Sequence, residues 1–185
     1  MKLKARIVKV SQFGCLAFVV LGLNACQFLS NDQNRDPRAQ DLDLREVIQS
    51  VLGVDYEDDS DVKTHVYIQN GVVLVTGNVA TKEQKSDIAA LLSKIVGIKT
   101  LHNELVVGEA TGIGARVGDG ILQNRVRLAF LNHAEIPHGK MQVVVRDNVV
   151  YLLGIVTEEE RDYTNKIVEN LNGVERLVSL LELSQ

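Results

Sequence analysis

The sequence predicts an α+β protein in which one α-β-β-α-β unit occurs twice. Three observations lead to this prediction. The apolar run that starts at Val72 recurs at an offset of 77 residues, at Val149, and each run follows a turn signal. An amphipathic helix precedes each run. A helical pattern that ends at a glycine follows it, and an alternating strand comes last. A chain of 185 residues has room for two such small units.

An amphipathic helix opens each unit. Apolar residues at helical spacing make its buried stripe in the first copy, namely Leu44, Val47, Ile48, Val51 and Leu52. The second copy has the corresponding stripe of Leu122, Val126, Ala129 and Phe130. The opposite face of the first helix is polar and is expected to be solvated, with Arg45, Glu46, Gln49 and Ser50.

A β-hairpin follows each of these helices. In the first copy, Asn70-Gly71 separates the strand-like segments 64–69 and 72–79. This dipeptide favours a tight turn because both of its positions need positive φ. The second copy repeats the pattern with 142–146, Asp147-Asn148 and 149–156. Aspartate and asparagine tolerate the same backbone conformation less easily than glycine.

A second helix and a last strand complete each unit. Ile88, Leu91, Leu92 and Ile95 recur at i, i+3, i+4 and i+7, which is typical of one helix face. Both helical patterns end at a glycine, where a left-handed cap needs no Cβ. The final strands alternate through Leu101, Leu105 and Val107, and through Leu177, Leu181 and Leu183.

Residues 1–25 have the features of a targeting segment and are excluded from the fold. The positive start contains Lys2, Lys4, Arg6 and Lys9. The apolar stretch 13–23 is too short to span a bilayer, which needs about 20 residues. An ordinary secretory signal with an incidental cysteine and an uncleaved anchor helix are the alternative interpretations.

The motif Leu23-Asn24-Ala25-Cys26 resembles the lipobox of bacterial lipoproteins. That resemblance implies cleavage before Cys26 and lipidation of Cys26. Residues 26–40 then comprise the lipidated cysteine and a segment whose polar composition predicts a flexible tether. The residue after the cysteine is not aspartate, which by resemblance to enterobacterial lipoproteins favours the outer membrane. We therefore expect a lipid-anchored protein that faces the periplasm.

The two repeats resemble BON domains. The resemblance lies in one glycine in the strand after each hairpin turn and one Gly-Ile or Gly-Val pair before the last strand: Gly77, Gly97-Ile98, Gly154 and Gly173-Val174. It implies two helices packed on one face of a three-stranded sheet in each domain. We expect BON domains at 41–108 and 118–185, joined by a Gly-rich segment at 109–117.

A lipobox followed by two such units resembles the dual-BON outer-membrane lipoproteins. This resemblance implies binding of anionic phospholipid through the first helix of the second BON domain, and a role in envelope integrity. The residues themselves agree, because the outer face of that helix combines aliphatic side chains with arginines. The candidate phospholipid-binding residues are Ile121, Arg125, Arg127 and Leu128.

The competing interpretation of this helix is that Ile121, Leu128 and Leu131 are buried against the first copy. In that case the protein is better explained as a periplasmic adaptor for envelope assembly or peptidoglycan-remodelling proteins. Exposure of the aliphatic face favours the phospholipid hypothesis, and burial favours the adaptor hypothesis.

Other function classes have little support. A net charge of −4 argues against general nucleic-acid binding, which needs a basic surface. No nucleophile and base stand in a recognisable arrangement, so we expect no enzyme and no cofactor. The glycines of 112–118 lack the spacing of a dinucleotide loop and are interpreted as the joint. His133, Glu135 and His138 lie in an expected loop, which favours surface residues over a metal site.

Overall fold

The computed structural model describes residues 36–56, 62–108 and 113–184. The expected signal segment, Cys26 and the expected tether as far as residue 35 lie outside the described residues. Within residues 36–56, 62–108 and 113–184, no helix has the length and apolar character needed to cross a membrane.

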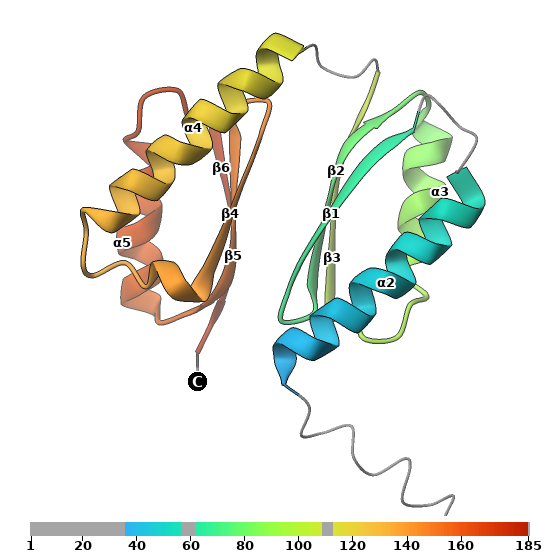
Figure 1. The fold of residues 1–185 in the computed structure, drawn as a ribbon, viewed down its shortest axis with the longest axis horizontal. Coiled ribbons are helices and arrows are strands. Elements are labelled where there is room, and N and C mark those ends of the chain that lie inside the picture. Colours follow the sequence, from blue (N-terminus) through green and yellow to red (C-terminus); the bar gives the residue numbers. More distant parts are fainter. Residues whose placement is uncertain (1–35, 57–61, 109–112, 185) are drawn as a thin grey trace, which may run out of the picture. The chain divides into compact units, whose positions relative to one another are not determined.

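Each repeat folds as an α-β-β-α-β unit. The first contains α2 (Pro37–Tyr56), β1 (Lys63–Gln69), β2 (Val72–Val79), α3 (Lys82–Leu92) and β3 (Thr100–Val107). The central strand β2 pairs antiparallel with β1 and parallel with β3. Figure 1 shows α2 and α3 on the same face of this sheet.

The second unit repeats this topology. It contains α4 (Ile113–Leu131), a short 3₁₀ turn (His138–Lys140), β4 (Met141–Arg146), β5 (Val149–Val156), α5 (Glu158–Glu169) and β6 (Arg176–Leu183). Strand β5 is central, antiparallel to β4 and parallel to β6. Helices α4 and α5 again share one face of their sheet (Figure 1). The α+β fold with two helices on one face of each three-stranded sheet is confirmed.

Both opening helices begin earlier than the sequence patterns indicated. Helix α2 starts at Pro37, so residues 37–40 are helical and not tether. The physical reason is an N-terminal signal, because proline suits the first helical position and the Asp36 side chain accepts a hydrogen bond from the Arg38 amide at 3.0 Å. Helix α4 starts at Ile113, so residues 113–117 are helical and not a joint.

The two hairpin turns have the expected backbone. Asn70 and Gly71 have φ of 54° and 79°, and Asp147 and Asn148 have φ of 50° and 61°. In each unit, one aspartate of the opening helix holds the turn by accepting hydrogen bonds from both of its backbone N–H groups. Asp41 performs this role in the first unit and Asp119 in the second. These two residues therefore occupy equivalent positions of the repeat.

Gly77 shows why the strand after the turn carries a glycine. Its φ is 129°, and a Cβ at this position would lie 1.8 Å from the Lys63 carbonyl oxygen on β1. Any side chain at Gly77 would therefore force β1 and β2 apart. A Cβ at Gly154, the equivalent residue of the second unit, would lie 2.5 Å from the Lys140 carbonyl oxygen.

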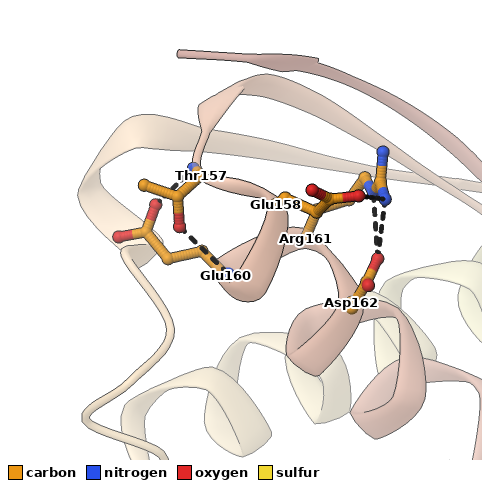
Figure 2. A network of polar contacts seen from close by, with 5 residues as sticks. All are labelled: Thr157, Glu158, Glu160, Arg161 and Asp162. Carbon is orange, nitrogen blue, oxygen red and sulfur yellow. Dashed lines mark hydrogen bonds and ion pairs between the residues drawn. The ribbon is translucent and has the colours of Figure 1, made fainter. Parts of the chain in front are cut away.

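A capping box begins each second helix. The Thr81 hydroxyl accepts from the Gln84 amide at 3.1 Å, and the Gln84 side chain accepts from the Thr81 amide at 3.0 Å. Thr157 and Glu160 repeat this arrangement at 3.2 and 2.8 Å, as Figure 2 shows. The same view shows Arg161 paired with the exposed carboxylates of Glu158 and Asp162.

Each unit has its own apolar core between its helices and its sheet. Leu44, Ile48 and Leu52 of α2 are buried as expected, but Val47 is 48% exposed because it lies on the flank of that stripe. Arg45 also departs from the expected solvated face, since its Nη1 donates to the Val66 carbonyl of β1 at 3.0 Å.

A third apolar cluster joins the two sheets on their helix-free faces. It comprises Val72 and Leu74 of β2 with Val144, Tyr151, Leu153 and Leu180 of the second unit. A polar link lies beside it, where Glu104 accepts from the Tyr151 hydroxyl at 3.3 Å and from the Arg176 guanidinium at 3.0 Å. The central strands β2 and β5 are thus buried on both faces.

Candidate functional site

Helix α4 has a buried face and an exposed aliphatic face. Leu122, Val126 and Phe130 are between 0% and 3% exposed and belong to the core of the second unit. The large aliphatic side chains on the other side are exposed, at 58% for Val117, 57% for Ile121, 60% for Leu128 and 63% for Leu131. We considered that Ile121, Leu128 and Leu131 are buried against the first unit. That interpretation is wrong, because these side chains are exposed and the two units meet through their sheets.

The exposed aliphatic residues form one stripe. Steps of four, seven and three residues separate Val117, Ile121, Leu128 and Leu131, so their side chains share one side of the helix. Asn124 is exposed and lies within the same stripe. At 1.5 Å per residue the stripe is about 21 Å long. We refer to these five residues as the α4 stripe.

The two candidate arginines lie on either flank of the α4 stripe and differ in their surroundings. The Arg125 guanidinium donates to the Asn172 carbonyl, just after α5, so this side chain is held by the fold. Arg127 is exposed and borders a groove of about 480 Å³ together with Phe130 and Leu131. Arg127 is therefore the candidate arginine that is more available to an external anion.

The first unit lacks an equivalent stripe. Because Asp41 and Asp119 are equivalent, each α4 residue corresponds to the α2 residue that precedes it by 78 positions. The α2 residues at the stripe positions are Ala39, Asp43, Glu46, Ser50 and Gly53. All five are small or polar, so an aliphatic outer face distinguishes the second unit from the first.

The BON domain family model matches residues 40–109 and 118–185. The chain belongs to the BON domain family. Each match covers one α-β-β-α-β unit, so Ile121, Arg125, Arg127 and Leu128 all lie on the first helix of the second BON domain.

Two relatives extend along most of this chain. The 21 kDa hemolysin of Actinobacillus pleuropneumoniae is 23% identical over 155 residues, which are 81% of this chain and 80% of the relative. The outer membrane lipoprotein DolP of Haemophilus influenzae is 21% identical over 170 residues, which are 91% of this chain and 88% of the relative. The chain is thus a dual-BON protein similar to DolP.

Similarity to solved structures is weaker. The structure of CdsD, a structural protein of the type III secretion system of Chlamydia trachomatis, is 12% identical and has a TM-score of 0.31. The matched region covers 76% of this chain and 63% of the CdsD chain. A likeness at this level supports no argument about the BON domains described above.

One of the other candidate residues, His133, has a structural role in the second BON domain. His133 Nδ1 lies 2.9 Å from the Tyr163 hydroxyl, and the two rings meet edge to face, which ties the end of α4 to α5. In the part of the chain that the structure describes, no three acidic, histidine or cysteine side chains are grouped to hold a metal ion.

Sequence reasoning missed two classes of residue around the site. Val117 was assigned to the joint, although its position four residues before Ile121 indicated the same helix face. Asp41 and Asp119 were not recognised as turn-holding residues. Their signal was an acid three residues before the first buried leucine in both repeats, Leu44 and Leu122.

Proposed function

We propose that this chain is an envelope-associated BON protein whose second domain binds anionic phospholipid through the α4 stripe and its flanking arginines. The observation that carries this proposal is the exposure of four large aliphatic side chains on one side of α4. A helix with that surface lies in a membrane interface with its aliphatic groups among the headgroups and acyl chains.

Charge adds selectivity to this surface. Arg127 is exposed at one flank of the stripe, where a guanidinium can pair bidentately with a lipid phosphate. One arginine near an anionic leaflet contributes about 1 kcal/mol. The helix alone is therefore a weak membrane site, and a covalent anchor would supply the effective concentration that it needs.

We also propose Cys26 as that anchor, after cleavage of residues 1–25, and the outer membrane, periplasmic side, as the location. Support comes from the lipobox-like residues before Cys26 and from the similarity to DolP, a protein named an outer membrane lipoprotein. We propose no enzymatic reaction for this chain.

The test is co-sedimentation of residues 27–185, which include every described residue, with vesicles of phosphatidylcholine alone or with added phosphatidylglycerol or cardiolipin. We expect binding to the anionic vesicles only. The variant Arg127→Glu/Leu128→Asp should weaken binding about ten-fold or more, because it replaces an exposed cation and an exposed aliphatic group by two acids. Arg125 is left unchanged because it is held by the fold.

The first BON domain offers a matched control. Gln49→Glu/Ser50→Asp places acids at the equivalent two positions of α2 and should leave vesicle binding unchanged. Equal loss in both variants would indicate a general charge effect. No preference for anionic vesicles at low salt would reject the phospholipid proposal and leave the adaptor hypothesis, with the α4 stripe as a surface for a protein partner.

A further inference from the structure

A polar cleft lies where the two sheets meet. It forms a cavity of about 390 Å³ that is lined by β1, β2, α3 and β3 of the first domain and by α4, β4, β5 and β6 of the second. An adjoining hollow of about 640 Å³ opens beside it. The side chains that line both spaces are all basic: Lys63, His65, Arg116 and Arg146.

Among the residues that the structure describes, Lys63, Arg116 and Arg146 form no ion pair with a carboxylate. The acids of the cleft are Glu104 and Asp147. Glu104 is already engaged, since it accepts from Arg176 at 3.0 Å and from the Tyr151 hydroxyl at 3.3 Å. A concentrated positive charge in a protein with net charge −4 calls for a separate explanation.

Two polar atoms at the cleft lack partners. Arg146 Nε and Thr76 Oγ1 are both buried without a hydrogen-bond partner among the described residues. The same guanidinium reaches the Tyr67 hydroxyl only at 3.4 Å. Buried donors are almost always satisfied in folded proteins, and leaving one unpaired is costly. An acceptor oxygen supplied from outside would complete this site.

His65 reports the local electrostatics. Partial burial, followed by the positive charges of Arg146 and Arg116, holds its pKa below the ordinary value. The neutral imidazole still has one N–H group to donate. Bound negative charge would reverse the effect of the two arginines on this ring.

We propose that this cleft binds a phosphate-type oxyanion, with the guanidinium groups of Arg116 and Arg146 as its principal donors. Guanidinium groups pair with phosphate oxygens bidentately, and several cations around one position favour a multiply charged anion over a single carboxylate. Lys63 and His65 lie where they supply further donors. The proposal does not depend on the α4 stripe, because none of the cleft residues belongs to it.

A free phosphate compound and the headgroup of a lipid share this chemistry. The test therefore titrates residues 27–185, followed by NMR of the histidine rings and arginine side chains, with inorganic phosphate and separately with glycerol 3-phosphate. Acetate at the same ionic strength is the carboxylate control. We expect saturable shifts at His65 and a rise in its pKa with the phosphate ligands, and at most weak effects of acetate.

Variants localise the site. Arg146→Gln and Arg116→Gln should each weaken phosphate binding about ten-fold or more, as expected for loss of a charge-assisted contact. Arg116 makes no hydrogen bond to another described residue, so its variant tests the site without altering the fold. Arg161→Gln, on the exposed side of α5, is the matched control and should bind phosphate like the parent chain.

The outcomes separate clearly. Binding of both phosphate ligands supports a general phosphate site, and binding of glycerol 3-phosphate alone supports a headgroup site. No saturable shift with either ligand, or equal weakening in Arg161→Gln, would overturn the proposal. Leu128→Asp should leave phosphate binding intact, so failure of the vesicle experiment and failure of this one are distinguishable.

Discussion

The side-chain carboxylate of Asp119 accepts a hydrogen bond from the backbone N–H of Asp147 at 3.0 Å. Its second oxygen accepts from the next residue, Asn148, at 3.1 Å. Asp119 is 5% exposed, so this one carboxylate fixes the opening helix to the hairpin turn inside the domain. Both turn residues have positive φ without being glycine, a conformation that needs such support.

Asp119→Ala should therefore destabilise the chain. Two turn amides in part-buried hydrogen bonds lose their acceptor, and we expect a loss of about 2–4 kcal/mol in the free energy of unfolding. Urea denaturation followed by far-ultraviolet circular dichroism measures it. Asp162→Asn, which changes an exposed aspartate of α5, should stay within about 0.5 kcal/mol of the parent. Equal effects of the two substitutions would contradict a specific role for Asp119.

At Gly77 the backbone allows only glycine. In Gly77→Ala the new Cβ would collide with the Lys63 carbonyl oxygen, and φ of 129° is unfavourable for any L side chain. We expect a loss of at least about 3 kcal/mol, which is strain plus a disrupted strand pair. The unfolding midpoint in urea provides the measurement.

The control for Gly77 is another glycine-to-alanine change. No atom would lie within 4 Å of a Cβ at Gly53 in α2. Because alanine favours helix, Gly53→Ala should be neutral or stabilise by up to about 1 kcal/mol. A similar loss in both variants would show that the close approach of β1 to β2 is not the cause.

Tyr151 links the two domains, and its hydroxyl should ionise at a higher pH than an ordinary tyrosine. Burial, and next the negative charge of Glu104, raise its pKa from the ordinary value of 10.0 to about 12, while Arg176 opposes the shift. The folded state thus retains the phenol proton more tightly than the unfolded state does. The contribution of Tyr151 to stability is present below pH 10 and is lost as the pH rises towards 12.

Phenolate absorbance during a pH titration tests this directly. Subtracting the titration curve of Tyr151→Phe from that of the parent chain should leave one transition near pH 12. Tyr151→Phe should also remove part of the decline in unfolding free energy above pH 10. A difference transition near the ordinary tyrosine value would show that the hydroxyl is not held in the interface.

Local sequence signals predicted most of each domain. The central strands were expected at 72–79 and 149–156, and β2 and β5 have these bounds. Their boundaries were clear because a turn precedes each strand and a helix cap follows it. The start of α2 was missed because Asp36-Pro37, a helix-start signal, lies in a polar stretch that resembles a tether.

Contacts between the domains were harder to predict. Strand β5 is apolar at nearly every position, which indicates burial on both faces, but the pattern does not identify the second partner. The cleft at the sheet junction is a further example, since Lys63 and Arg146 come from different repeats. The sequence did not show whether the α4 stripe is exposed. The structure shows that it is, because the domains are joined by their sheets and not by this helix.

His65 gives the last prediction, and it must be measured in buffer without phosphate. Its pKa should lie below the ordinary value of 6.5, chiefly through burial and then through Arg146 and Arg116. The unfolded state therefore binds this proton more readily than the folded state. As the pH falls below 6.5, the folded state loses stability relative to a His65→Gln chain. Ring NMR gives the pKa, and Arg146→Gln should raise it partway, because burial remains. A pKa at or above the ordinary value, or one that Arg146→Gln leaves unchanged, would show that the arginines of the cleft do not act on this ring.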